Sequence, residues 1–517
     1  MIKLFDTTLR DGAQSAEVNF SIRDKVEIVN ALDDFGIDYI ELGWPGSNPK
    51  DMEAFLDVSK LKLNGKVVAF GSTRRKGVDA TKDINLQAIL KSKAPVACIF
   101  GKTWLHHVDK QLKMGSEENL EAIKDSIVFL KSEGLQVFYD LEHFFDGFKD
   151  NKEYALECLK TAALANADCL VLCDTNGGCL PNEVLKIINE VKEFMNKEGL
   201  KKDLGVHFHN DSGTAVANTL AAIGAGVNEV QGTINGLGER TGNADLCQLI
   251  PAIVLKKKLK LNVKLEKITE LSKFVYTLAN IKALGSQPFV GKHAFSHKGG
   301  IHVDAVMKGA SYEHIDPLAV GNKRDIILSD LSGKANIVEV AKKFGFNVKK
   351  DNPQVWKMLK EVEVLEKKGY DIGNLKAEQF LLVDKFFGSG NQFFKIDTWK
   401  IMSEQRNGEF SEAVITGTVD GKEREVVAPV KGGPVGAAYS ALMKMVGTNY
   451  KNMKEIKLVN YKVMIAEDRG ADSSVRVYIE FKNGKEEWGT VGVSTNILEA
   501  SLEAIEKGFR YYLVKKN

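Results

Sequence analysis

The first half of the chain alternates short, β-branched apolar runs with longer amphipathic segments. Eight of the apolar runs have the length and composition of buried strands, at residues 2–6, 38–43, 66–71, 95–100, 135–142, 168–175, 203–209 and 228–234. The segments between them repeat apolar residues at helical spacing, and several end in glycine, as helices often do. Eight successive strand–helix units in about 250 residues favour a parallel sheet closed into a (β/α)₈ TIM barrel over an open, doubly wound sheet. We therefore predict an α/β barrel at residues 1–257.

The pattern changes twice in the second half of the chain. Residues 258–330 are rich in glycine and histidine and read as irregular, whereas 331–390 repeat apolar residues at helical spacing. From residue 392 onward apolar and polar residues alternate as in strands, and an order of three strands and one helix occurs twice. We predict irregular and helical linker subdomains at 258–391, followed by an α+β regulatory domain with a duplicated βββα unit at 392–517.

The composition changes this picture little, but it excludes several classes of partner. The 517 residues are 44% hydrophobic and 27% charged, with a formal net charge of only +2. So small a charge indicates no nucleic-acid partner and no attraction to an anionic membrane. The chain has no apolar run long enough to cross a bilayer, and its first residues lack the apolar core of a signal peptide. Because the six cysteines form no C-x-x-C pair, we expect free thiols and a cytoplasmic location.

Polar side chains gather within or just after the C-terminal ends of the predicted strands. They are Asp6, Arg10, Asp11, Glu41, Glu142, Asp174, Thr175, His207 and His209. Barrel enzymes assemble their active sites at this face, from residues of several strands. A barrel with a purely structural role has no reason to collect charge there, so the pattern predicts an enzyme.

His207 and His209 carry the strongest single signal, in the segment HFHND. Residues two apart on a strand face the same side, and two imidazoles at a barrel mouth form half of a divalent-metal site. The alternative, a pair of core histidines, is disfavoured by the carboxylates on neighbouring strands. Asp11 after strand one and Asn243 after strand eight can supply oxygen ligands, because strands one, seven and eight are neighbours in a closed barrel. This mixed set suits Zn, Mn, Co or Mg and does not choose among them.

Arg10 stands beside Asp11 and predicts a binding group for an anion. A guanidinium is the natural bidentate partner of a substrate carboxylate or of a developing enolate oxygen. Glu41, at the end of strand two, is placed to orient it. Thr175, at the end of strand six, offers a hydroxyl group to the same carboxylate.

Five motifs together resemble one enzyme family. FDTTLRDGAQ, YIELGWPGS, CDTNGG, HFHND and GLGERTGN stand in the order and strand positions of the isopropylmalate, homocitrate and citramalate synthases. These motifs are shared with the wider group of barrels that includes hydroxymethylglutaryl-CoA lyase. Within the family the chain looks like the long form of the citramalate synthases, and the likeness runs through the C-terminal domain.

The resemblance implies a Claisen condensation between acetyl-CoA and a small 2-oxo acid, with pyruvate expected as the acceptor. Asp11, His207, His209 and Asn243 would hold the metal that the 2-oxo acid chelates. Arg10 would stabilise the developing alkoxide, with Glu41 fixing its orientation and Thr175 holding the carboxylate. A metal that polarises the ketone and a base that removes a proton from a weakly acidic methyl group are what this reaction requires.

The resemblance also implies residues for acetyl-CoA and a quaternary structure. Glu142 sits where the family places a glutamate near the acetyl thioester. His302 and Tyr312, both beyond the barrel, match the pair that activates acetyl-CoA, and His302 is the candidate for proton abstraction. In related enzymes these two residues reach the partner's barrel, which implies a homodimer with shared sites.

The side chain of the oxo acid separates the alternatives within the family. A branched side chain needs a wide pocket, whereas for a methyl group most of that pocket must be filled by the protein. The candidates to fill it are residues near Phe70, Ile99 and Phe100, at the ends of strands three and four. 2-Isopropylmalate synthase is the main alternative, followed by homocitrate synthase and a lyase acting in reverse. A non-catalytic metabolite sensor on a decayed barrel is disfavoured, because every expected polar position is occupied.

Residues from about 392 onward carry none of the predicted catalytic set. They resemble the effector-binding domain of these synthases, in which KGGPVGAAYSAL (431–442) and GTVGVSTNILEASL (489–502) would place glycine-rich turns before helices. Backbone N–H groups at helix starts can receive the carboxylate of an amino acid. For a citramalate synthase the expected effector is isoleucine, and the alternative role of this domain is dimer packing alone.

Overall fold

The computed structural model of the chain describes residues 2–307, 312–405, 409–467, 473–484 and 486–516. The chain forms two compact units. The first comprises Met1–Phe295 with Ile315–Lys323, and the second comprises Ser296–His314 with Arg324–Asn517. The first unit is larger than the barrel predicted at 1–257.

Eight parallel strands close into a barrel in the first unit. They are β1 (Lys3–Asp6), β2 (Tyr39–Gly43), β3 (Lys66–Ser72), β4 (Val96–Lys102), β5 (Gln136–Glu142), β6 (Cys169–Asp174), β7 (Asp203–Phe208) and β8 (Glu229–Gly232). Strand β1 pairs in parallel with both β2 and β8, which closes the sheet. The predicted (β/α)₈ barrel is therefore confirmed.

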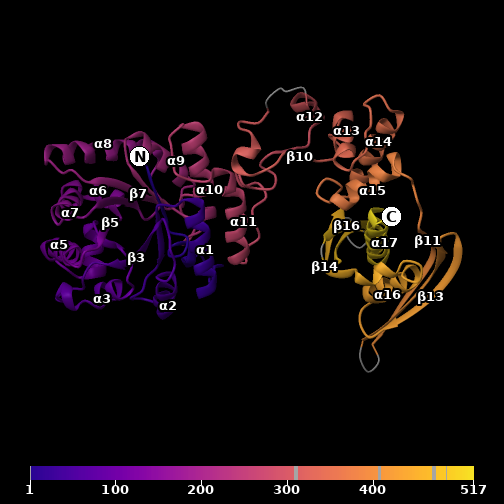
Figure 1. Cartoon of the computed structure of the whole chain (residues 1–517), viewed down its shortest axis with the longest axis horizontal. Coiled ribbons are helices and arrows are strands. Elements are labelled where there is room, and N and C mark those ends of the chain that lie inside the picture. Colours follow the sequence, from indigo (N-terminus) through magenta and orange to yellow (C-terminus); the bar gives the residue numbers. More distant parts are fainter. Residues whose placement is uncertain (1, 308–311, 406–408, 468–472, 485, 517) are drawn as a thin grey trace. The chain divides into compact units, whose positions relative to one another are not determined.

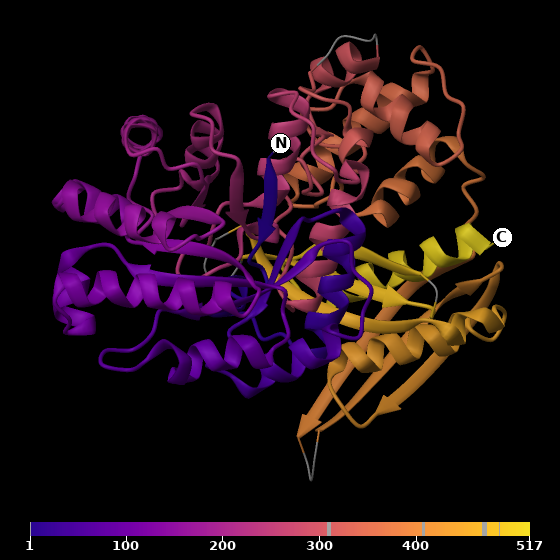
Figure 2. The same ribbon diagram turned by 60° about the vertical axis from the view of Figure 1, so that its left-hand side comes forward.

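Helices cover the outside of this barrel (Figures 1 and 2). They are α1 (Ile22–Phe35), α2 (Pro49–Val58), α3 (Ile84–Lys91), α4 (Leu105–His107), α5 (Ser116–Ser132), α6 (Phe144–Asp150), α7 (Lys152–Leu164), α8 (Pro181–Lys197), α9 (Ala215–Gly224), α10 (Leu246–Pro251) and α11 (Ile268–Leu278). Helix α1 shows the local signals well: the Ser21 hydroxyl accepts from the Asp24 N–H in a capping box, and Gly36 ends the helix at φ 108°. Helix α11 was missed within a stretch predicted to be irregular. It packs against α1, which extends the first unit beyond residue 257.

Strand alternation sorts the side chains of β3 and β4 into two layers. Phe70 and Cys98 point into the barrel, where Phe100 packs against them, and the core there also holds Phe5 and Phe138. The intervening residues face outward into the larger apolar layer between strands and helices. The polar ends of the inward rows are thereby directed to the C-terminal mouth of the barrel.

The second unit begins with short elements and a group of helices. They are β9 (Ser296–His297), α12 (Gly300–Met307), β10 (Asp325–Ile326), α13 (Lys334–Lys343), α14 (Pro353–Lys367) and α15 (Lys376–Phe387). Leu382 and Val383 of α15 pack with α13 and α14, while Ala377 belongs to the core of the C-terminal domain. Helix α15 is thus shared between the linker and the domain predicted to start at 392.

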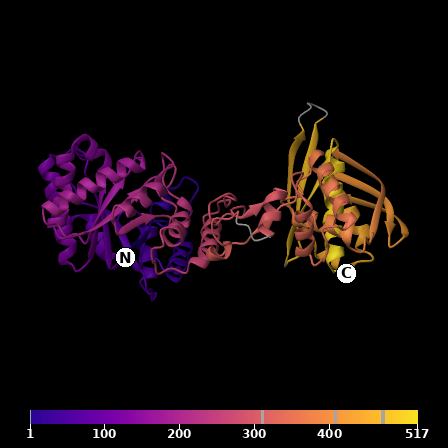
Figure 3. The same cartoon turned by 90° about the horizontal axis from the view of Figure 1, so that it is seen from above.

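The C-terminal domain repeats one arrangement twice. Its elements are β11 (Phe394–Gln405), β12 (Glu409–Val419), β13 (Lys422–Val430), α16 (Pro434–Val446), β14 (Lys457–Glu467), β15 (Ser474–Lys482), β16 (Glu487–Ser494) and α17 (Ile497–Lys516). Each antiparallel sheet has three strands, and the two helices pack between the sheets (Figure 3). The predicted α+β domain with a duplicated βββα unit is confirmed.

All six cysteines are buried and none forms a disulfide, as the sequence predicted. Within the described ranges, no helix combines the length and the apolar composition needed to cross a membrane.

Candidate active site

A cavity of about 170 Å³ opens at the C-terminal mouth of the barrel. Its walls come from the ends of β1 to β7 and from the loop after β8. They are formed by Arg10, Asp11, Gln14, Trp44, Phe70, Phe100, Asp140, Glu142, Cys173, Thr175, His207, His209 and Glu239. The fold therefore brings most of the barrel residues predicted from the sequence into one site. Asp6 and Asp174 instead accept backbone N–H groups of the loops that follow their strands.

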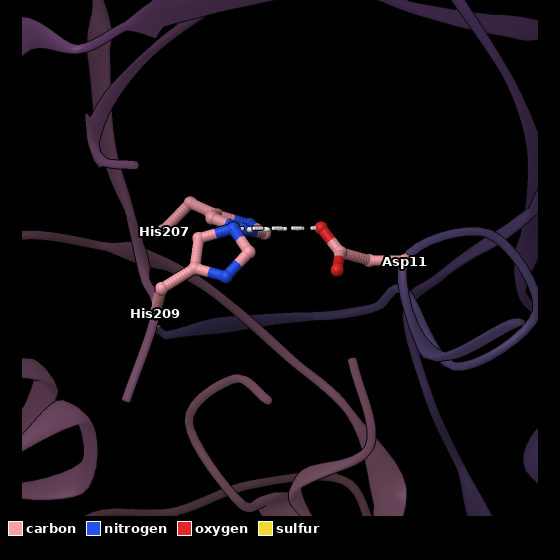
Figure 4. Close-up of side chains that lie close together, drawn as sticks. All are labelled: Asp11, His207 and His209. Carbon is pink, nitrogen blue, oxygen red and sulfur yellow. Dashed lines mark hydrogen bonds and ion pairs between the residues drawn. The ribbon is translucent and has the colours of Figure 1, made fainter. Parts of the chain in front are cut away.

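Asp11, His207 and His209 converge on one point in this cavity (Figure 4). The two Nε2 atoms are 3.4 Å apart, and Asp11 Oδ2 lies 3.6 Å from His207 Nε2 and 3.7 Å from His209 Nε2. A point equidistant from three such atoms is about 2.1 Å from each, which is the length of a bond from a divalent metal to imidazole or carboxylate. All three residues are buried. The geometry suits a bound cation.

Asn243 completes the group on the side of the β8 loop. Its Nδ2 donates to Asp11 Oδ1 over 2.9 Å and to the Leu237 carbonyl over 3.3 Å. Its Oδ1 is buried and has no hydrogen-bond partner among the described residues. Gly238 permits this approach, because a Cβ at that position would overlap Asn243 Nδ2. A buried acceptor without a partner is costly, so a cation beside Asp11 fits this donor set.

The charge states of these groups also suit metal binding. Burial alone would raise the pKa of Asp11, but Arg10, His209 and His207 more than offset it and hold this pKa well below its usual value. Burial, together with the neighbouring His209, lowers the pKa of His207 to about 3. Burial likewise lowers the pKa of His209. One carboxylate and two neutral imidazoles are the forms that coordinate a metal.

Arg10 is held in place from three directions. Its Nε donates to Glu41 Oε2 over 2.6 Å, its Nη1 donates to Asp11 Oδ2 over 2.8 Å, and its guanidinium lies 3.9 Å from the centre of the Phe70 ring. Burial alone would lower the pKa of Arg10, but Glu41, Asp11 and Asp140 more than compensate. A permanent positive charge therefore faces the cavity beside the Asp–His–His cluster, with little freedom to move.

Thr175 and Glu142 face the same cavity from β6 and β5. The Thr175 hydroxyl accepts the His143 N–H over 2.9 Å, which leaves its own proton free to be donated. The Glu142 carboxylate pairs with Lys102 Nζ at 2.5 Å. One polar donor and one paired acid thus stand opposite Arg10.

An aromatic wall forms the remaining side of the cavity. The rings of Phe70 and Phe100 stack at 5.4 Å, and Trp44 meets them edge-on at 5.5 and 5.6 Å respectively. The assignment of Ile99 to this pocket was wrong. Ile99 alternates with Phe100 along β4, so it points outward into the layer between strands and helices and does not line the cavity.

His302 and Tyr312 belong to the second compact unit. Their rings stack with centroids 4.6 Å apart, and both side chains are exposed. The structure therefore brings these two predicted residues together with each other. Their part in catalysis stays a prediction.

Several residues at this site were not predicted, and for four of them the sequence holds a usable signal. Trp44 follows the end of β2 directly, where a large aromatic residue is a usable signal. Lys102, Asp140 and Gln231 lie within β4, β5 and β8. Asp140 alternates with Glu142 and Gln231 with Glu229, and this spacing places each pair on the inner face of the barrel. The spacing that revealed His207 and His209 would have found them.

Comparison with known proteins matches the whole chain. Residues 1–275 match the HMGL-like family, residues 289–369 the homocitrate synthase post-HMGL domain-like family, and residues 375–513 the LeuA allosteric (dimerisation) domain. A protein of Geobacter sulfurreducens named (R)-citramalate synthase is 45% identical over 100% of this chain and 98% of its own length. One of the same name from Sulfolobus acidocaldarius is 45% identical over 99% of this chain and 97% of its own.

The chain belongs to the (R)-citramalate synthase family. A protein of Methanocaldococcus jannaschii named 2-isopropylmalate synthase is more distant, at 32% identity over 100% of this chain and 95% of its own length. Enzymes of the HMGL-like family use a divalent metal, which agrees with the buried Asp–His–His cluster. The family resemblance expected from the five motifs is confirmed.

Proposed function

We propose that this chain is an acyltransferase that condenses acetyl-CoA with pyruvate to give (R)-citramalate and CoA, the first step of the pyruvate route to isoleucine. The similarity along its full length to proteins named (R)-citramalate synthase carries this proposal. The cavity holds a candidate cation site and an arginine for the acceptor, and the base is proposed to come from the second unit. A proton leaves the acetyl methyl group, its carbon bonds to the keto carbon of pyruvate, and the keto oxygen is protonated. Water then cleaves the thioester and releases CoA.

In this proposal Asp11, His207, His209 and Asn243 hold a divalent cation, with zinc, manganese, cobalt and magnesium as candidates. A bound cation would polarise the ketone and stabilise negative charge on its oxygen. The protein supplies two imidazoles and one carboxylate whose ligand atoms lie close together. Asn243, whose Nδ2 contacts Asp11, adds a buried amide oxygen without a partner among the described residues. Such a mixed N/O donor set is compatible with each of these metals.

Arg10 stabilises the oxygen on which negative charge develops. Glu41 and Asp11 hold the guanidinium, so little reorganisation is needed when charge appears. The Thr175 hydroxyl donates a hydrogen bond to the carboxylate of the oxo acid. The methyl group of pyruvate packs against Phe100, Phe70 and Trp44, where a branched chain would meet the aromatic wall.

His302 and Tyr312 activate acetyl-CoA, with His302 as the candidate base and Glu142 near the thioester. As the family resemblance implies, we propose a homodimer in which these two residues serve the partner's barrel. The match to a dimerisation domain at residues 375–513 supports this arrangement.

The C-terminal domain is proposed to bind isoleucine as an inhibitor. Of the two glycine-rich turns, the one before α17 already has an internal cap, because Asn496 Oδ1 accepts the N–H groups of Leu498 and Glu499. Helix α16 begins after Gly433 without a side-chain cap. Its turn is therefore the better candidate for the effector's carboxylate.

The direct test is release of free CoA thiol from acetyl-CoA with three oxo acids: pyruvate, 2-oxoisovalerate and 2-oxoglutarate. We expect metal-dependent release with pyruvate at the highest kcat/KM. Equal or better efficiency with 2-oxoisovalerate would favour isopropylmalate synthesis. If no oxo acid gives thiol release at any metal concentration, the chain is not a synthase of this kind.

A further inference from the structure

Gln231 lies inside the barrel between the proposed metal site and a buried acid. It belongs to β8, is only 1% exposed, and points inward like Glu229 two residues earlier. Its Oε1 is 2.9 Å from His207 Nδ1, and its Nε2 donates to Asp140 Oδ1 over 3.3 Å. We propose that Asp140 and Gln231 are positioning residues that hold His207 in the tautomer whose Nε2 is free to bind a cation. This inference rests on the proposed metal site.

Asp140, Gln231 and His207 form a chain of hydrogen bonds, here called the relay. Its direction follows from which of these groups can donate a hydrogen bond. In the structure Gln231 Nε2 donates to Asp140 Oδ1, and the carboxylate of Asp140, when ionised, can only accept, so it takes the NH₂ end of the amide. The carbonyl end of the same amide then faces His207 and can only accept. His207 must therefore carry its proton on Nδ1.

The tautomer decides whether His207 can act as a ligand. A neutral imidazole carries one N–H, and with the proton on Nδ1 the Nε2 lone pair points at the place where His209 and Asp11 converge. With the proton on Nε2, an N–H would occupy that place and exclude a cation. Acceptors behind metal-binding histidines are known to fix this choice and to raise ligand basicity.

His209 provides an internal comparison. Its Nδ1 is buried and has no hydrogen-bond partner among the described residues, whereas His207 Nδ1 has Gln231. The relay therefore acts on one of the two histidines. Before metal is added, we expect the Nδ1–H tautomer at His207, whereas no acceptor among the described residues holds the proton of His209 on Nδ1.

The first test uses the unmodified chain. Nitrogen-15 labelled histidine, observed by long-range proton–nitrogen correlation in the metal-free protein, reports the tautomer of each ring, and His207→Ala assigns the signal. We expect the Nδ1–H form of His207. An Nε2–H form would overturn the inference without touching the proposal that the site binds metal.

The second test measures affinity for Co²⁺ by titration followed through its visible absorption. Gln231→Met removes the acceptor at nearly constant volume and should weaken binding about 10- to 100-fold. Gln231→Glu keeps an acceptor and should retain most of the affinity. The control is Gln379→Met, the same change at a buried glutamine of the second unit, which should leave affinity unchanged.

The outcomes separate this inference from the function on which it rests. If wild type binds one Co²⁺ and His209→Ala abolishes binding, the metal site stands. Unchanged affinity in Gln231→Met would then overturn the relay alone, and so would an equal loss in Gln231→Glu and Gln231→Met. Failure of the wild-type chain to bind Co²⁺, Zn²⁺ or Mn²⁺ would overturn both.

Discussion

Phe100 offers the sharpest test of the proposed acceptor pocket. Its ring stacks on Phe70 and meets Trp44 edge-on, so it forms one of three aromatic faces around the place proposed for the pyruvate methyl group. Replacing Phe100 by Ala removes this face and leaves the contact between Trp44 and Phe70 in place. We expect the variant to accept 2-oxoisovalerate much better relative to pyruvate.

The magnitude follows from the difference between the substrates. 2-Oxoisovalerate carries two methyl groups more than pyruvate, and a fitted pocket discriminates by about 1–3 kcal/mol for each. The intact wall should thus favour pyruvate by about 2–6 kcal/mol. Phe100→Ala removes only one of the three faces, so we expect it to remove the discrimination against about one of the two methyl groups. The ratio of kcat/KM for 2-oxoisovalerate to kcat/KM for pyruvate should then rise about 10- to 200-fold. Phe100 is only partly buried, so its removal should cost less than the 3–5 kcal/mol typical of a core phenylalanine.

The assay is thiol release with each oxo acid, and Ile99→Val is the matched control. Ile99 neighbours Phe100 on β4 but faces the outer apolar layer, so this change should cost about 0.5–1.5 kcal/mol of stability and leave the ratio unchanged. If folded Phe100→Ala keeps the wild-type ratio within twofold, Phe100 does not shape the pocket. A shift of the same size in Ile99→Val would refute the assignment of inner and outer faces.

Three further predictions address the metal, the effector and the barrel interior. His209→Ala should lower thiol release at least 100-fold while circular dichroism stays native, since the ligand lies at the rim of the barrel, and near-normal activity after exhaustive chelation would refute the metal site. A chain ending at Asn391 should keep some catalysis and lose isoleucine inhibition; inhibition of the residual rate as strong as in the full chain would place the effector elsewhere. Glu229 is buried without a partner for either oxygen among the described residues, and burial raises its pKa well above the ordinary 4.5. Above pH 4.5 the folded state therefore retains a proton that the unfolded state loses, and the free energy of unfolding of the wild type falls as pH rises towards the folded-state pKa. Glu229→Gln has no such proton, so its free energy of unfolding should rise relative to wild type by up to about 1.4 kcal/mol per pH unit between these two pKa values. Parallel urea-unfolding profiles of the two proteins from pH 5 to 8 would contradict this.

Much of the barrel was predictable because its signals are local. A strand buried on both faces is a short apolar run wherever it occurs. A helix is recognised by the spacing of its apolar residues and by end residues such as Ser21 and Gly36. The spacing of His207 and His209 likewise fixed their common direction without knowledge of any other strand. For the same reason the duplicated βββα order was visible before the two sheets were seen.

Residues that matter through a distant partner were not predictable in this way. Glu41 and Arg10 are 31 positions apart, and Gln231 lies 91 positions from Asp140, yet each pair is joined by a hydrogen bond. The apolar residues of α11 have helical spacing, but the helix belongs to the first unit because it packs against α1. The sequence cannot state these pairings, because closing the barrel is what brings the strands together.

The sequence by itself determined the family, the strand order and the residue types at the barrel mouth, since these depend on periodicity and on motifs of a few residues. Only the tertiary structure decided which side chains share the cavity. In the structure Trp44 and Asp140 line the cavity and Ile99 does not, while Gln231 lies behind His207. The physical reason is alternation in a closed sheet. A strand offers its residues to two faces in turn, and which face meets the cavity is settled only when all eight strands have paired.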